Sequence, residues 1–222
     1  MSTMDLRLEG NVHILTLTNS ENDNTFTLDV LNEYLAALDE VESYKGNTAL
    51  VVTCEHEKTW SNGINLPWMT SQSADDVKIF VNTLEEVFYR VAMLNAPTIA
   101  CINGNCYAGG AILASAFDFK IMRSDRGRFC YPEVNIKIPF TELMIDIIDL
   151  IPNKHALKHL ALTGIAKTGA ECLEDQIVDA LYPMNELQAA TLAYATELAT
   201  KDRGTYTTIK RSMRKNIARH RQ

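Results

Sequence analysis

The 222-residue sequence lacks the features that mark fibrous, disulfide-rich or membrane-spanning proteins. It contains no run of about 18 uncharged apolar residues, which argues against a membrane-spanning helix. Its ten glycines and six prolines are too few for a fibrous or linker-rich protein. The five cysteines are odd in number and include no Cys-x-x-Cys pair, so we expect buried, reduced thiols and no bound metal.

Targeting signals are also missing from both ends of the sequence. The first residues, Met1–Asp5, lack the basic and apolar segments of a secretory signal. The last residues, Arg219–Gln222, do not form a Ser-Lys-Leu peroxisomal signal. We therefore expect a cytoplasmic protein.

The composition is typical of one globular domain, with 46% hydrophobic and 22% charged residues. The net charge of −7 is unevenly distributed, because residues 1–200 sum to −14 and residues 201–222 to +7. An acidic body argues against general nucleic-acid binding. The basic tail indicates either a solvated helix face or an anionic partner, which would be nucleic acid, another subunit or ligand phosphates.

Apolar runs alternate with amphipathic segments over the first 140 residues. Residues 6–17 predict a β-hairpin that turns at Gly10 and Asn11. The pattern then predicts strands over residues 48–53, 98–102 and 117–122, and helices over residues 28–41, 74–94 and 111–116. This alternation indicates an α/β fold with a largely parallel sheet.

The pattern changes near residue 140, after which only helices are predicted. They cover residues 141–150, 153–163, 168–174, 185–200 and 204–219. We therefore divide the chain into an α/β core, residues 1–140, and a helical C-terminal region, residues 141–222. The apolar residues of the second region predict that it packs on the core or on another subunit.

Two glycine-containing loops follow buried strands, at the edge where parallel sheets place their ligands. One loop is Ser61–Asn65, and the other, Asn103–Gly110, leads into a helix. Glycine allows a close approach of the backbone, and a helix N-terminus presents unpaired N–H groups. Converging N–H groups from both loops would form an oxyanion hole for a carbonyl oxygen. Either loop alone is more typical of a simple chain reversal.

Glu133 is the only acidic residue in the aromatic and aliphatic stretch Arg128–Phe140. Burial among such residues raises the pKa of a carboxyl group and makes it a competent base near neutral pH. Considered alone, the stretch is better explained by a partly exposed glutamate after a proline turn.

Three stretches of the sequence together carry the ordered motifs of one family. They are Trp60–Leu66, Pro97–Gly110 and Asp118–Glu133, which contain Trp-Ser-x-Gly-x-Asn-Leu, Pro-Thr-Ile-Ala followed by Ala-Gly-Gly, and Phe-x-x-Pro-Glu. In this order the chain resembles the crotonase (enoyl-CoA hydratase/isomerase) superfamily over nearly its whole length. The resemblance implies a crotonase-like ββα spiral core with a helical C-terminal trimerisation part.

The resemblance also implies roles for individual residues. The backbone N–H groups of Ile64 and Gly109 match the pair that holds the thioester oxygen in the family. The residues around them are implied in substrate binding, namely Ser61, Asn62, Gly63, Asn65, Gly110 and Ile112. The resemblance implies no metal and no redox cofactor. CoA is not counted as a cofactor, because it is part of the acyl-CoA substrate.

Family members that hydrate a double bond use two glutamates, and only one of them is present here. Ile112 occupies the first position, and Glu133 occupies the second. Moving a double bond from C3 to C2 needs one carboxylate, and a dry pocket beside Ile112 discourages attack by water. The chain therefore most resembles the Δ3,Δ2-enoyl-CoA isomerases, with Glu133 as the base.

Two alternatives stay open at this point. One is a hydratase, or another enzyme that acts through a thioester enolate, in which Glu142 or Asp146 supplies the lost acid. The other is a non-catalytic acyl-CoA-binding protein of the same fold.

The resemblance also offers a role for the basic tail. In relatives the C-terminal helices pack at a trimer interface and bring basic side chains near the CoA phosphates. We therefore predict that Lys210, Arg211 and Arg214 bind CoA, and we expect a homotrimer or a dimer of trimers. Trp60 and Asn65 depart from the phenylalanine and aspartate of the family, which is expected to change the affinity for CoA.

Overall fold

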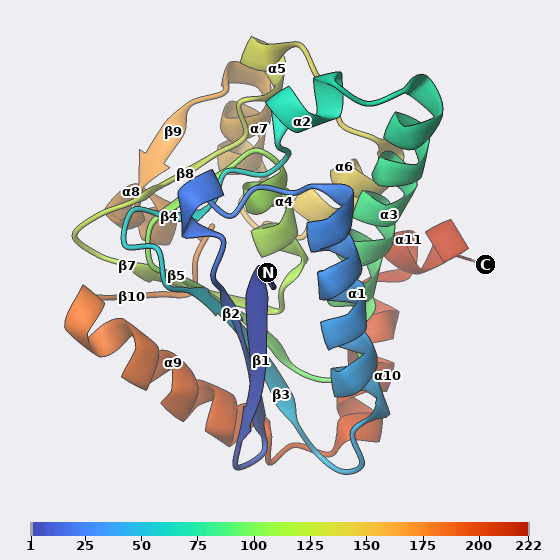
Figure 1. Cartoon of the computed structure of the whole chain (residues 1–222). Helices are drawn as coiled ribbons and strands as arrows, with labels where there is room; N and C mark the ends of the chain where they lie inside the picture. Colours follow the sequence, from blue (N-terminus) through green and yellow to red (C-terminus); the bar gives the residue numbers. More distant parts are fainter. Residues whose placement is uncertain (1, 222) are drawn as a thin grey trace.

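The structure is a computed structural model that describes residues 2–221 and contains two sheets (Figure 1). The larger sheet has the strand order β1-β2-β3-β5-β7-β10, and its strands are β1 (Met4–Glu9), β2 (Val12–Leu17), β3 (Ala49–Cys54), β5 (Thr98–Ile102), β7 (Phe119–Arg123) and β10 (Ala180–Tyr182). The smaller sheet has the order β4-β6-β8-β9, and its strands are β4 (Thr59–Ser61), β6 (Asn105–Tyr107), β8 (Arg128–Cys130) and β9 (Ala166–Thr168). The β1–β2 and β8–β9 pairs are antiparallel, and the other pairs are parallel.

Successive units of the chain place one strand in each sheet and then form a helix. β3 and β4 are followed by α2 (Leu66–Thr70) and α3 (Ala74–Met93), β5 and β6 by α4 (Gly109–Ala116), and β7 and β8 by α5 (Glu133–Ile136). This repetition is the predicted ββα spiral, which confirms the fold class. The sequence analysis missed β4, β6 and β8, because strands of three residues are too short to show a period of two.

Helices cover both faces of the larger sheet. In β3, Leu50 and Val52 point to one face, where they join the core beneath α3 and α1 (Leu28–Ser43). Ala49 and Val51 point to the other face and pack with α9 (Met184–Leu198). A strand with both faces covered is apolar throughout, which explains the uninterrupted Ala-Leu-Val-Val sequence.

The region after residue 140 is mainly helical, and its helices are α6 (Glu142–Ile148), α7 (Lys154–Thr163), α8 (Gly169–Glu174), α9, α10 (Arg203–Met213) and α11 (Lys215–Ala218). The expectation that it contains only helices is wrong, because β9 extends the smaller sheet and β10 the larger one. The single helix predicted over residues 204–219 is also interrupted at Arg214. Within residues 2–221, no helix combines the length and the apolar character needed to span a membrane.

Candidate active site

The two predicted loops meet at a contact that only glycine allows. Gly63 has φ +74°, and a Cβ atom on it would lie 2.4 Å from the backbone nitrogen of Gly109. A Cβ atom on Gly110 would lie 2.5 Å from the carbonyl oxygen of Ser61. Real Cβ contacts are not this short, so both glycines are required for the loops to approach each other.

Ser61 holds the first loop in place from within the protein. The side chain is completely buried, its Oγ donates to the carbonyl oxygen of Asn24 at 2.8 Å, and it accepts from the N–H of Gly63 at 3.1 Å. Asn65 caps α2, because its side-chain oxygen accepts from the N–H of Trp68 at 3.0 Å. The side chains of Ser61 and Asn65 therefore make hydrogen bonds within the protein, and their predicted contact with substrate stays a prediction.

Two backbone N–H groups near this contact are available to a ligand. Phe26 donates to the carbonyl of Gly63 at 2.7 Å and accepts from the N–H of Asn65 at 3.0 Å, so the intervening Ile64 turns its N–H away from Phe26. Gly109 is the first residue of α4, and the N–H of a first helical residue has no partner within its helix. Within residues 2–221, neither N–H donates to a protein acceptor.

The orientation of Gly109 is set by an unusual backbone conformation at Ala108. This residue has φ +50°, a value that a side chain disfavours, and its N–H donates to the carbonyl of Cys130 at 3.0 Å. The hydrogen bond ties the start of α4 to β8, the strand that leads to Glu133. Strained residues of this kind often occur at functional sites.

Glu133 is buried, with 6% of its surface exposed, and it opens α5. Burial raises the pKa of its carboxyl group to about 7, because the charged form loses hydration. Its Oε2 atom has no hydrogen-bond partner among the described residues. The stretch Arg128–Phe140 considered alone favoured a partly exposed glutamate, and the structure shows a buried one.

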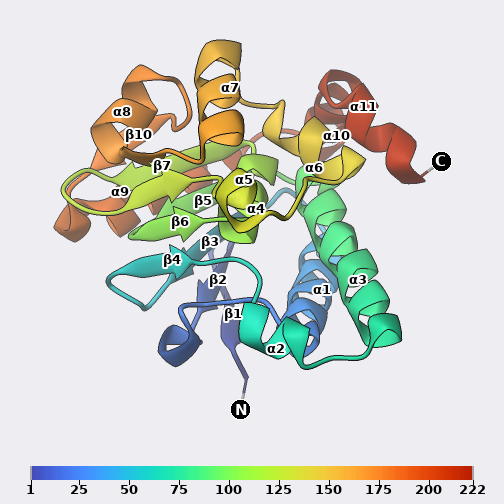
Figure 2. The ribbon, with the colours of Figure 1, turned by 90° about the horizontal axis from the view of Figure 1, so that it is seen from above.

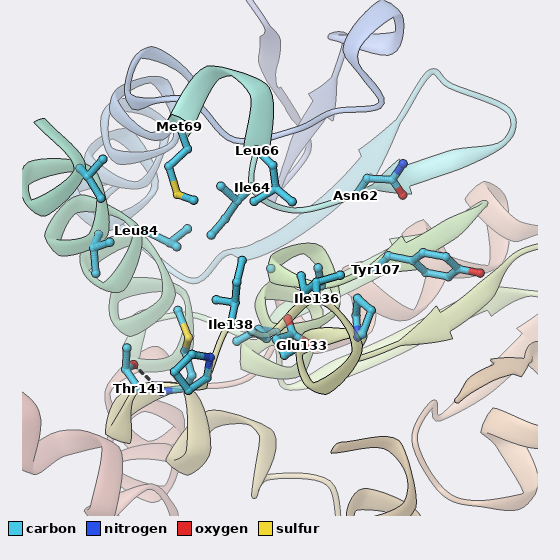
Figure 3. Close-up of a pocket in the computed structure, with 18 residues that line it drawn as sticks. Asn62, Ile64, Leu66, Met69, Leu84, Tyr107, Glu133, Ile136, Ile138 and Thr141 are labelled. Atoms are coloured by element: carbon cyan, nitrogen blue, oxygen red, sulfur yellow. Dashed lines mark hydrogen bonds between the residues drawn. The ribbon is translucent and has the colours of Figure 1, made fainter. Parts of the chain in front are cut away.

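Ile64, Gly109 and Glu133 line one cavity of about 440 Å³. Seen from above, α4 and α5 lie at the centre of the molecule with α2, α3 and α6 around them (Figure 2). Asn62 and Tyr107 lie at one end of the cavity, Met69 and Leu84 at the other, and Glu133 between them (Figure 3). Among the described lining residues, Glu133 is the only carboxylate.

Ile112 lines the cavity together with these groups, at the position where the resemblance places a second acid. We call Ile64, Gly109, Ile112 and Glu133 the catalytic wall, after the roles that the family resemblance implies for this site. Asn62 also lines the cavity, and its buried Oδ1 atom has no hydrogen-bond partner in the described chain. Of the predicted substrate-binding residues, Asn62 and Ile112 face the cavity, whereas Ser61, Gly63, Asn65 and Gly110 do not line it.

The opposite side of the cavity was missed by the sequence analysis. We call it the aliphatic wall, and it consists of Leu66, Met69, Val77, Val81, Leu84 and Met144 from α2, α3 and α6. Val77, Val81 and Leu84 belong to the apolar face of α3, and the sequence pattern does not separate residues that line a cavity from residues of the core. The half-buried state of Val77 and Val81 distinguishes a cavity wall from a core, and periodicity does not reveal it.

Glu142 and Asp146 do not reach this cavity. They line a separate pocket with the C-terminal residues Asn216, Arg219 and His220. Glu142 is exposed, and Asp146 lies 2.7 Å from Nε2 of His220. Neither can supply the second acid of the hydratase alternative in this arrangement.

Two of the three predicted CoA-binding basic residues are buried. Lys210 and Arg214 are 4% and 8% exposed, and they contact the carboxylate of Asp118 at 2.7 and 2.9 Å. The prediction that they bind phosphates is therefore wrong, because both side chains are buried and bonded to Asp118 and to backbone carbonyls inside the protein. Arg211 is exposed, and its role stays a prediction.

The described residues contain no group of three or more His, Cys, Asp or Glu side chains arranged to hold a metal ion. All five cysteines are unpaired and buried, as expected from their number and spacing. Burial raises the pKa of the Cys130 thiol, which lies near Glu133, to about 11.

Comparisons with known proteins show which family the chain is similar to. A sequence model of the enoyl-CoA hydratase/isomerase family matches residues 7–222. The chain is 30% identical to enoyl-CoA delta isomerase 3 of Arabidopsis thaliana over 99% of its length and 94% of the relative. It is 29% identical to the peroxisomal enoyl-CoA delta isomerase 2 of that plant, over 90% and 86%. A solved enoyl-CoA hydratase/isomerase family protein from Pseudomonas syringae has a TM-score of 0.89 at 25% identity, covering 97% and 91%.

Proposed function

We propose a function from one premise, which is that the chain belongs to the enoyl-CoA hydratase/isomerase family. We propose that it is an isomerase that moves the double bond of 3-enoyl-CoA thioesters to the 2-trans position. One observation carries the proposal: Glu133 is the only carboxylate lining the described cavity, and Ile112 stands where a hydratase would need a second acid. The two isomerases from Arabidopsis thaliana support the same choice.

In the proposed reaction, the N–H groups of Ile64 and Gly109 donate to the thioester oxygen. Glu133 removes a proton from C2, and the electrons of that C–H bond form a dienolate whose charge rests on the oxygen. Glu133 then returns the proton to C4, which leaves the double bond between C2 and C3. Each N–H group contributes on the order of 3 kcal/mol, by analogy with measured oxyanion holes.

The pKa of Glu133 suits both proton transfers. At a value of about 7, the group is ionised often enough to accept a proton and acidic enough to return it. The unpaired Oε2 atom leaves one oxygen free for the substrate. The acyl chain would lie against the aliphatic wall, and the polar end at Asn62 and Tyr107 would receive the CoA side (Figure 3).

The first alternative, a hydratase, needs a second acid near the double bond. Glu142 and Asp146 line a different pocket, which weighs against it. The second alternative, a non-catalytic acyl-CoA-binding protein, does not explain why a carboxylate is buried without a partner at the cost of its hydration.

Incubation with 3-hexenoyl-CoA and 2-hexenoyl-CoA, each alone, tests the proposal. Interconversion followed by absorbance, without a mass gain of about 18 Da, is the expected result for an isomerase. Addition of water would support a hydratase, and binding without conversion would support a non-catalytic protein. Replacing Ile112 by glutamate should introduce some hydration, because it restores the two-acid arrangement.

Other properties remain predictions from the sequence. We propose that the reaction uses no metal or redox cofactor, because Glu133 and the two N–H groups account for every proton and charge in it. Trimeric assembly, contact of Arg211 with CoA phosphates and location in the cytoplasm also stay predictions. The name of one relative places that protein in peroxisomes.

A further inference from the structure

A buried chain of hydrogen bonds joins two parts of the site without touching the cavity. The hydroxyl of Tyr131 lies 2.5 Å from Oγ of Ser115, and Oγ of Ser115 donates to the carbonyl of Ala111 at 2.8 Å. A hydroxyl group has one proton, and that of Ser115 is used in the bond to Ala111. Tyr131 is therefore the donor to Ser115, which fixes the direction of the whole chain.

The ends of this chain lie next to the proposed catalytic groups. Tyr131 is two residues before Glu133, and Ala111 is two residues after Gly109. The chain thus connects the segment that carries the base to the helix whose first N–H binds the thioester oxygen. Close to it, the N–H of Ala108 donates to the carbonyl of Cys130 and links the same two segments through their backbones.

We infer that Tyr131 is a positioning residue, which sets the separation between the Glu133 carboxylate and the Gly109 N–H through Ser115. The inference rests on the proposed function. Glu133 begins a helix of only four residues, which has little rigidity of its own. A displacement of about 1 Å between reacting groups can lower a rate about a hundredfold, so an external tether matters here.

The ring of Tyr131 is held independently of its hydroxyl. It makes edge-to-face contacts with Phe129 and Phe140, with ring centroids 5.4 and 6.0 Å apart. Tyr131 is completely buried and Ser115 is 1% exposed. A change of Tyr131 to phenylalanine therefore removes the hydrogen bond while the ring keeps its packing.

The test compares Tyr131→Phe, Ser115→Ala and the double variant in D₂O with 3-hexenoyl-CoA. We measure kcat, KM and the rate of deuterium entry at C2, which needs the base, the oxyanion hole and exchange of the proton on Glu133 with solvent. Each single change should lower kcat and exchange about tenfold with KM unchanged. The double variant should lose no more than either single one, because the two residues act as one unit.

A matched control is Tyr34→Phe. Tyr34 is also buried, and its hydroxyl has no hydrogen-bond partner among residues 2–221, so wild-type kcat is expected.

Wild-type kcat in Tyr131→Phe, with only its melting temperature lowered, would overturn the inference and leave the proposed function intact. If Tyr131→Phe folds poorly, Ser115→Ala breaks the same hydrogen bond from its other end, and wild-type kcat in that variant would overturn the inference equally. Absence of both isomerisation and C2 exchange in the wild-type protein would overturn both the inference and the proposed function.

Discussion

The two walls of the cavity are built on opposite principles. The catalytic wall depends on backbone positions, because Gly63 and Gly109 are so close that a single methyl group between them would collide. The aliphatic wall consists of apolar side chains, of which Val77 and Val81 are half-buried. On the proposed function, the first wall would determine whether a reaction occurs, and the second would determine which acyl chain fits. Substitutions in the catalytic wall should therefore lower kcat, whereas substitutions in the aliphatic wall should have smaller effects and change the preference for acyl-chain length.

The largest effect is expected from Glu133→Gln in the catalytic wall. Loss of the only carboxylate in the described cavity should lower kcat by about 10²–10⁴-fold, the usual contribution of a positioned base. Binding of the CoA ester should persist, because glutamine has nearly the same shape. Turnover assays and calorimetric titration with 3-hexenoyl-CoA measure the two properties, and a wild-type rate would remove Glu133 from the mechanism.

The stability of the same variant separates loss of the base from loss of the fold. Burial raises the pKa of Glu133 from 4.5 to about 7, so the folded protein keeps a proton that the unfolded chain releases over this range. The stability of the wild type therefore falls between these pH values and stays lower above them. At pH 8 the Glu133→Gln variant should be more stable by about 3 kcal/mol, as measured by urea unfolding.

Gly63→Ala tests how strictly the catalytic wall depends on its backbone. The new Cβ atom would lie 2.4 Å from the nitrogen of Gly109 and would displace the N–H of that residue, a donor of the proposed oxyanion hole. We expect kcat to fall by about 10²-fold or more, the usual effect of losing one such donor.

Gly10→Ala is the control, because Gly10 also has positive φ but has no atom within 4 Å of a new Cβ. It should lower stability by about 1 kcal/mol and leave kcat unchanged. Equal activity losses in both variants would show that backbone strain, not the contact, matters.

The pH dependence of kcat/KM should follow the ionisation of Glu133. Only the ionised form accepts a proton, and its pKa is about 7, so activity should rise with pH and level off above that value. Below it, activity should fall about tenfold per pH unit. A profile that is flat between about pH 5 and 9 would contradict the raised pKa.

The smallest effect is expected in the aliphatic wall. Val81→Phe fills part of the cavity and should lower kcat/KM for 3-decenoyl-CoA relative to 3-hexenoyl-CoA. Each methylene that loses its contact costs about 0.8 kcal/mol, or about fourfold. Ile79→Phe on the exposed face of α3 is the control and should leave the ratio unchanged. An equal loss with both substrates would show that Val81 acts on the catalytic wall instead.

The sequence predicted the fold well wherever a periodic pattern was long enough. The hairpin, α1 and α3 occur close to their expected positions, whereas β9 and β10, with three residues each, were missed inside a region predicted to be helical. Ile64 and Gly109 were predicted as site residues because the family motif marks these backbone positions. No local pattern in the sequence shows that the two loops that carry them approach each other in the fold.

Charge patterns gave the least reliable predictions. The basic tail suggested exposed basic side chains that bind phosphates. In the structure, however, Lys210 and Arg214 lie against Asp118, which is about ninety residues away in the sequence. A pairing between such distant residues depends on the tertiary fold, which a local count of charges does not contain. The aliphatic wall was missed for a related reason, because the period of an amphipathic helix is the same beside a core and beside a cavity.

The cluster around Asp118 has a consequence for how the enzyme can be shortened or fused. Nζ of Lys210 donates to the carbonyls of Leu94 and Ala96 just beyond α3, and Arg214 donates to the carbonyls of Ala116 and Phe117 at the end of α4. The C-terminal helices thus hold the far ends of the two helices whose opposite ends border the cavity. A truncation before Lys210 would leave Asp118 as a buried, uncompensated charge and release both helices. Engineered extensions should therefore begin beyond α11.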